Sequence, residues 1–366
     1  MVTHSLSRTL AVTAGVAVVG AAAASFALLP AQAGDHGGGS DSFREVRLVA
    51  DRHGQARITD PKLVNPWGLA ASPTSPLWVS NNGTSTSTLY QGATSGKSVM
   101  KVPLDVKIPG GGAPTGVVYN PTDGFKLTSD GKSGPALFIF AGEDGDISAW
   151  NKSGDIKKAV LVAKSRHTIY KGLTMVRTGG KEYLLAADFH NNRVDVFDDH
   201  FQHVTAPNAF SSKHVPHGYA PFGIADLDGR VYVTYAKQDK NKKDDVAGPG
   251  HGFVNVFDER GRFRESLVRR GVLDSPWGLA IAPHGSGSFA GKLLVGNFGD
   301  GRIHVVDQHD GRVVATLLGK GHHPIVIDGL WGLVPGNGTS GDRSDVWFSA
   351  GPDDESHGLL GILEQR

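Results

Sequence analysis

An apolar–Gly–apolar unit recurs six times along the chain, and this internal repeat constrains the fold more than any other feature. Consecutive central glycines are 48, 56, 51, 55 and 54 residues apart. A period this regular indicates one structural unit repeated six times. The central glycines are Gly68, Gly116, Gly172, Gly223, Gly278 and Gly332.

Short stretches with alternating apolar and polar residues follow each unit, as in Leu77-Trp-Val-Ser and Val194-Asp-Val-Phe. Such alternation between Gly, Asp and Asn turns is typical of β-strands. Three or four strands in about fifty residues is the size of a propeller blade. We therefore predict an all-β, six-bladed β-propeller that forms a single domain over residues 43–366. A pair of β-sandwiches and a β-helix are alternatives that the six regular units disfavour.

The two ends of the chain predict how the ring closes. The last repeat has strand-like sequence near Leu330, Val346 and Leu359 and then ends at Arg366, so its fourth strand is missing. Residues 43–50, FREVRLVA, are strand-like and precede the first unit. We expect this N-terminal segment to form the outer strand of blade six, which removes an unpaired sheet edge. The glycines fit innermost strands, where a missing side chain permits close approach.

Two segments carry a resemblance to known repeats. Residues 184–198, LLAADFHNNRVDVFD, and 293–307, LLVGNFGDGRIHVVD, resemble NHL-type propeller repeats. The chain from about 43 to 365 is similar to an uncharacterised family of secreted bacterial propellers, some of which carry a PEP-type C-terminal sorting signal. This chain ends Leu-Glu-Gln-Arg and lacks such a signal. The resemblance implies the fold and export, and it implies no particular activity.

The N-terminus has the pattern of a secretory signal. Residues 10–29 are apolar, and Ala31-Gln32-Ala33 matches an A-x-A cleavage site. We expect residues 1–33 to be removed, 34–42 to be a flexible leader, and the mature protein to be secreted and monomeric. A membrane anchor is the alternative for the apolar run; after cleavage we expect no membrane association.

Composition excludes several function classes. The chain has no Cys, which excludes disulfides, a thiol nucleophile and Cys-ligated metals. Its 37 basic and 36 acidic residues give a net charge of +1 without a long basic run, so we expect no nucleic-acid partner.

Propeller topology predicts where a site lies. Because blade strands run up and down, the loops between strands two and three open on the same face as the links between blades. His and carboxylate side chains from many repeats converge there. The candidate ligand-binding residues on this rim are Lys171, Asp188, His190, Asn191, His217, His323 and Asp328.

Lys171 is the most unusual of these candidates, because the other five units place Trp, Thr or Phe before the glycine. A Lys at a crowded inner strand needs a partner, and we expect Asp188 or Asp328 to supply it. The bland interpretation is that the Asp and Asn residues serve turns and that the His residues are solvated. The insertion 239–245, DKNKKDD, is expected to be a solvated excursion on the same face, with a lid as the alternative.

Two function classes remain open. The first is a secreted binding protein whose polar mouth holds a small molecule, a glycan or a peptide. The second is an extracellular hydrolase or lyase that uses a divalent cation such as calcium or zinc at the same mouth. No Gly-x-Ser-x-Gly or His-Glu-x-x-His motif demands catalysis, so the sequence favours the binding protein.

Overall fold

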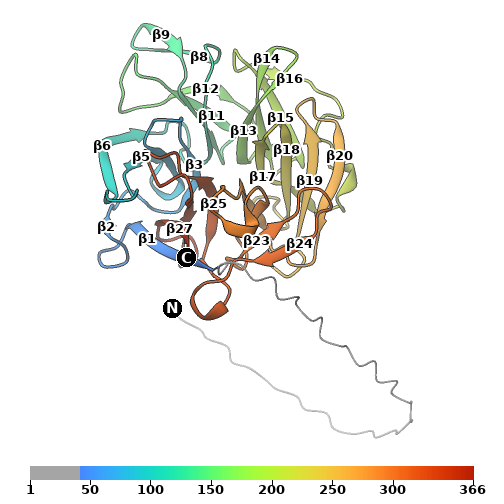
Figure 1. The fold of residues 1–366 in the computed structure, drawn as a ribbon. Coiled ribbons are helices and arrows are strands. Elements are labelled where there is room, and N and C mark those ends of the chain that lie inside the picture. The colour runs from blue at the N-terminus through green and yellow to red at the C-terminus, as the bar shows by residue number, and fades with distance from the viewer. Residues whose placement is uncertain (1–41) are drawn as a thin grey trace, which may run out of the picture. The chain divides into compact units, whose positions relative to one another are not determined.

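The computed structural model describes residues 42–366, which form six mainly antiparallel blades around a central axis (Figure 1). Residues 1–33, which we expect to be a signal, and residues 34–41 of the expected leader lie outside the described residues. No described helix has the length and apolar character needed to cross a membrane. The fold is the six-bladed all-β propeller that the repeats predict.

Within each blade, the strands are arranged in the following order from the central axis outward. Blade one has β3 (Pro66–Ala70), β4 (Leu77–Asn81), β5 (Thr86–Gln91) and β6 (Met100–Lys107). Blade two has β7 (Pro114–Tyr119), β10 (Phe138–Gly142), β11 (Asp146–Trp150) and β12 (Val160–Lys164), with a small hairpin of β8 (Lys126–Ser129) and β9 (Lys132–Pro135). Blade three has β13 (Tyr170–Thr178), β14 (Lys181–Asp188), β15 (Arg193–Asp198) and β16 (His203–Val204).

The second half of the ring repeats this order. Blade four has β17 (Tyr219–Leu227), β18 (Arg230–Lys237), β19 (Gly252–Asp258) and β20 (Phe263–Arg269). Blade five has β21 (Pro276–Ile281), β22 (Leu293–Asn297), β23 (Ile303–Val306) and β24 (Val313–Thr316). Blade six has β25 (Leu330–Pro335), β26 (Val346–Ala350), β27 (Leu359–Gln365), β1 (Phe43–Ala50) and β2 (Ile58–Thr59). Short 3-10 turns are η1 (Asn82–Thr84), η2 (Ser212–His214), η3 (Gly287–Phe289) and η4 (Lys320–His322).

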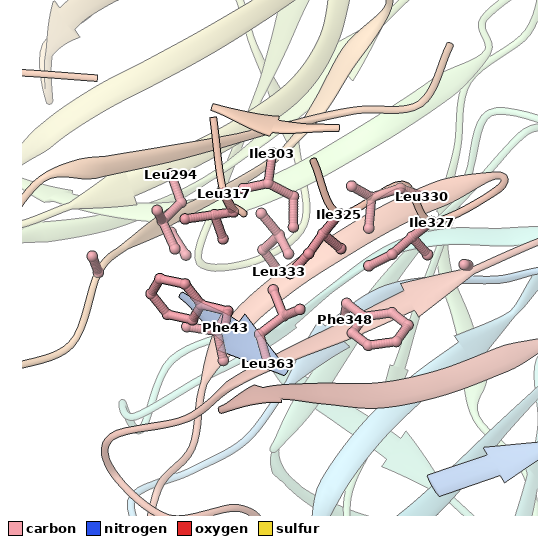
Figure 2. Close-up of a cluster of buried hydrophobic side chains, with 14 of the residues drawn as sticks. Phe43, Leu294, Ile303, Leu317, Ile325, Ile327, Leu330, Leu333, Phe348 and Leu363 are labelled. Atoms are coloured by element: carbon pink, nitrogen blue, oxygen red, sulfur yellow. The ribbon is translucent and has the colours of Figure 1, made fainter. Parts of the chain in front are cut away.

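The N-terminal strand closes the ring as predicted. β1 pairs antiparallel with β27 from Phe43 opposite Gln365 to Ala50 opposite Leu359. β2 then adds a fifth, parallel strand outside β1, which the sequence analysis did not anticipate. Phe43 also enters the buried cluster between blades five and six, near Leu294 and Leu363 (Figure 2). The closure therefore combines a strand ladder with a hydrophobic core.

The six central glycines explain why the inner strands can meet. A Cβ atom built on any of them would come within 3.0 Å of the next blade's inner strand, which is closer than real Cβ contacts. The Cβ of Gly68 would meet Thr115 of blade two, and that of Gly332 would meet Trp67 of blade one. Close approach around the whole ring thus requires glycine, as the repeat indicated.

Candidate functional site

The inner strands all begin on the face that carries the interblade links. The residue before each central glycine lies at this end of the channel, and these residues are mostly aromatic. Trp67 stacks on Trp331 with ring centroids 3.6 Å apart, and Trp277 meets both edge-on. Phe298, from the loop after β22, stacks on Trp331 from another side at 4.0 Å. The channel is therefore closed at this end by an aromatic plug.

Lys171 is the charged member of this layer and is only 3% exposed. Its Nζ lies 2.6 Å from Glu143 Oε1 and 3.2 Å from Asp244 Oδ1, and it sits over the Trp67 ring at 5.0 Å from the centroid. Burial by itself would lower the pKa of this ammonium, but the two carboxylates raise it above its ordinary value. Lys171 is thus a charged, paired group in a site that contains residues of blades one to four.

The predicted partners of Lys171 were wrong. Asp188 is buried and accepts hydrogen bonds from the Asn191 side chain at 2.7 Å and from the Ile169 N–H at 3.3 Å. Asp328 is exposed and accepts the Asp353 N–H at 2.9 Å. The true partners come from the loops after β10 and β18, because those loops project over the channel while Asp188 is held within its own turn.

A network of amides and acids extends from the Lys171–Glu143 pair to residues of blades one and six. Asn82 donates to Glu143 at 3.1 Å, and Asn65 donates to Asn82 at 3.3 Å and to Glu355 at 2.5 Å. Asn65 also accepts the Trp331 indole N–H at 3.1 Å. We call Asn65, Asn82, Glu143, Lys171, Asp244, Asp245 and Glu355 the polar mouth.

The acids of the polar mouth differ in their electrostatics. Burial would raise the pKa of Glu143, but Lys171 and Asn82 hold it below its ordinary value. Burial raises the pKa of Glu355; the Asn65 hydrogen bond and Lys171 oppose this shift, while Glu143 and Asp245 add to it. Burial likewise raises the pKa of Asp245. The mouth thus holds four carboxylates and one buried ammonium, and burial disfavours the charged form of two of these acids, Glu355 and Asp245.

The backbone that presents Glu355 is also unusual. Asp353, Asp354 and Glu355 have φ values of 55°, 53° and 63°, so three consecutive residues with side chains adopt the left-handed region. Such residues cost free energy and persist where the surroundings fix them. The turn is fixed by the Asn65–Glu355 bond and by Asp328, which accepts from the Asp353 N–H.

The remaining predicted residues lie around this mouth without joining it. His190 is half-buried, and its Nδ1 lies 3.2 Å from the carbonyl oxygen of Lys242 in the β18–β19 loop. Asn191 caps the turn around Asp188, while His217 and His323 are exposed. Of the seven predicted residues only Lys171 belongs to the polar mouth.

Sequence reasoning placed Asn82, Glu143 and Glu355 on the correct face but did not select them. Asn65 was missed altogether, although it opens the first Pro-Trp-Gly unit. The β18–β19 insertion was expected to be a solvated excursion, yet it returns to the mouth and places Asp244 against Lys171. The four charged residues that precede Asp244 in this insertion, Asp239, Lys240, Lys242 and Lys243, were the available signal.

No protein-family model matches the chain. The sequence is 32% identical to the uncharacterised protein R648 of Acanthamoeba polyphaga mimivirus over 324 residues, which covers 86% of this chain and 78% of that protein. The uncharacterised mimivirus protein L690 is also 32% identical and is covered to 84%.

Solved structures with the same fold are more distant in sequence. Virginiamycin B lyase from Staphylococcus aureus superimposes with a TM-score of 0.52 at 12% identity, covering 89% of this chain and 99% of the lyase. A glucose dehydrogenase superimposes with a TM-score of 0.51 at 15% identity, covering 82% of this chain and 96% of the dehydrogenase. Identities this low support the propeller fold and nothing more specific.

Proposed function

Because this chain belongs to the family of the uncharacterised mimivirus proteins R648 and L690, we propose a function from its own residues: it is a binding protein whose polar mouth holds a small cationic ligand. The observation that carries this proposal is the charge imbalance. Lys171 balances Glu143, with Asp244 as its second partner, whereas the half-buried Glu355 and Asp245 add negative charge, and residues 42–366 supply no second buried Lys or Arg.

The physical reason is that burial disfavours the charged forms of Glu355 and Asp245, and the neighbouring carboxylates add to this cost. Half-buried carboxylates repel each other more strongly than carboxylates in water, because the local dielectric is lower. A ligand that brings positive charge relieves this repulsion and gains charge-assisted hydrogen bonds.

Two kinds of cation fit carboxylate and amide oxygens. Calcium takes oxygen ligands from Asp, Glu and Asn side chains, and a small organic amine takes the same groups as hydrogen-bond acceptors. Zinc prefers sites with nitrogen or sulfur ligands, and the polar mouth contains no His. We therefore expect calcium or a small amine to bind, and zinc to bind more weakly.

The experiment is calorimetric titration of the purified protein with calcium, zinc and the diamine putrescine. Glu355→Gln and Asp245→Asn should each weaken binding of the preferred cation at least tenfold. Asp310→Asn is the matched control, because Asp310 is exposed in the β23–β24 loop on the other face. Equal binding by the parent, the two mouth variants and the control would refute a cation site at the polar mouth.

A second candidate function is acid–base chemistry at the same mouth, as in a hydrolase or lyase. The observation in its favour is that the pKa values of Glu143 and Glu355 are shifted in opposite directions, which suits a base and an acid. Turnover of a chromogenic ester and glycoside panel that is lost in both Glu143→Gln and Glu355→Gln, while cation binding by Glu143→Gln persists, would favour the enzyme.

We also propose export. The A-x-A motif at 31–33 supports removal of the first 33 residues. Expression of the full chain in a bacterial host should yield protein in the periplasm or medium whose N-terminal residue is Gly34. Retention of Met1 on exported protein would contradict this cleavage.

A further inference from the structure

Beyond the polar mouth, the central channel opens toward the opposite face as a separate cavity of about 430 Å³. Its walls are the stretches of the inner strands that follow the central glycines, so it starts where the polar mouth ends. Trp277 lines it and also belongs to the aromatic plug. The aromatic plug therefore lies between this cavity and the polar mouth.

The side chains that line this cavity carry no charge. They are mainly aliphatic, with Leu69, Leu173, Met175 and Leu333 as examples, and only Thr174 and Tyr119 carry a hydroxyl. The Thr174 hydroxyl already accepts the Asp226 N–H at 3.0 Å. Ordered water needs two to four polar partners, and these side chains offer few of them.

Backbone groups give the cavity a limited polar character. Each described blade ends at its inner strand, so the axis-facing edge of that strand pairs with no further strand. Its N–H and C=O groups are strong hydrogen-bonding groups. A ligand with an apolar body and a neutral hydroxyl or amide satisfies both the side chains and these edges.

We infer that this cavity is a second binding site, for an uncharged apolar molecule that carries a hydroxyl or amide group. Its volume lies within the range of roughly 300–1,000 Å³ that is usual for small-molecule pockets. Charged molecules are disfavoured because no described lining side chain offers a counter-charge. The site is independent of the polar mouth, since the aromatic plug lies between them.

A series of straight-chain alcohols tests this inference on the mature protein by calorimetry. From hexanol through octanol to decanol, affinity should rise about fourfold per added methylene, which is the factor that corresponds to burying one CH₂ group. The gain should stop once the chain fills the cavity. Absence of saturable binding across the series would overturn the inference.

Two variants locate the binding. Ala71→Trp and Ala225→Trp place a large ring on residues that line the cavity, and each should weaken octanol binding at least tenfold. Ala247→Trp makes the same change at an exposed loop position outside the cavity and should bind like the parent. Unchanged affinity in folded Ala71→Trp and Ala225→Trp would place the alcohols elsewhere and overturn the site.

A measurement that needs no cavity-filling variant covers the case in which those proteins do not fold. Bromo-octanol should quench tryptophan fluorescence in the parent because Trp277 lines the cavity. Trp277→Phe should remove most of the saturable quenching, because it removes the indole that lines the cavity. Saturable quenching that persists in Trp277→Phe would contradict binding in the channel.

Discussion

The two ends of the central channel are made by the same six inner strands, yet they differ in chemistry. Before the glycines, the strands carry Trp67, Trp331 and Lys171, and loops from several blades add carboxylates and amides. After the glycines, the walls are aliphatic and enclose an open cavity. The comparison shows that the repeat fixes geometry, while single residues and loops decide what each end can bind.

β1 closes the ring that forms both ends of the channel, so deleting this strand should have the largest effect on stability. A chain that starts at Asp51 lacks β1 and loses the burial of Phe43, Leu48 and Val49. At about 1.5–3 kcal/mol for each fully buried large side chain, the loss is on the order of 5–10 kcal/mol, comparable to the whole stability of a domain. We expect aggregation, or a melting temperature far below that of a chain starting at Ser42. A truncated protein that melts like the longer one would show that β1 is dispensable.

The polar mouth should be sensitive to charge in a way that the cavity is not. Lys171→Met leaves Glu143 half-buried without its cation and should cost about 3–5 kcal/mol in the free energy of unfolding. Adding Glu143→Gln should recover most of this loss. Leu333→Met in the cavity keeps volume and should cost less than about 1.5 kcal/mol. Denaturant melts of the four proteins check this; a double variant as unstable as Lys171→Met would contradict the pairing.

Half-buried acids near both ends of the channel should make the free energy of unfolding fall as the pH rises. Burial raises the pKa of Asp226, at the end of β17 away from the polar mouth, to about 6. A carboxyl whose pKa is raised on folding favours the fold below its unfolded pKa, near 4, and this stabilisation is lost as pH rises through about 6. Asp226→Asn should therefore stabilise the protein by about 1–2 kcal/mol at pH 8, with almost no change at pH 4.

Glu355→Gln at the polar mouth should also stabilise the protein at pH 8, because burial raises the pKa of this group too. The measurement is a set of melts of both variants and the parent between pH 4 and pH 8. Should either variant lose stability at pH 8 while matching the parent at pH 4, the corresponding carboxyl is stabilising as an anion. The matched control is again Asp310→Asn, which is exposed.

The smallest effects are expected at the exposed histidines near the polar mouth. His217→Ala and His323→Ala should each change the free energy of unfolding by less than about 0.5 kcal/mol, as is usual for exposed positions. They should also leave calcium and amine binding unchanged. Loss of binding in either variant would show that the site extends to the interblade links.

The blade architecture could be predicted because it repeats locally. The period of the glycine units, the alternation within strands such as 194–197 and the unpartnered strand at 43–50 each report a backbone requirement. The structure confirms the six blades and the closure of blade six by β1. The need for glycine in the inner strands could be predicted for the same reason, because a Cβ atom at Gly68 or Gly332 would clash with the backbone of the next blade.

The site was harder to predict because it is not periodic. Lys171 stood out as a departure from the repeat, but its partners Glu143 and Asp244 lie 28 and 73 residues away. Which loop reaches the axis depends on turn geometry, such as the left-handed run at 353–355. Asp188 is also a carboxylate that could pair with a Lys, but it accepts a hydrogen bond from Asn191 within its own turn.

The sequence by itself therefore determined the number of blades, the strand that closes the ring and the buried Lys that breaks the repeat, because each of these is encoded in residues close together along the chain or in their regular spacing. Only the tertiary structure decided that Lys171 pairs with Glu143 and Asp244 and that the aromatic layer seals one end of the channel. The physical reason is that hydrogen bonds and ion pairs act over about 3 Å, so loops from separate blades must first be placed by the ring before their side chains can select one another.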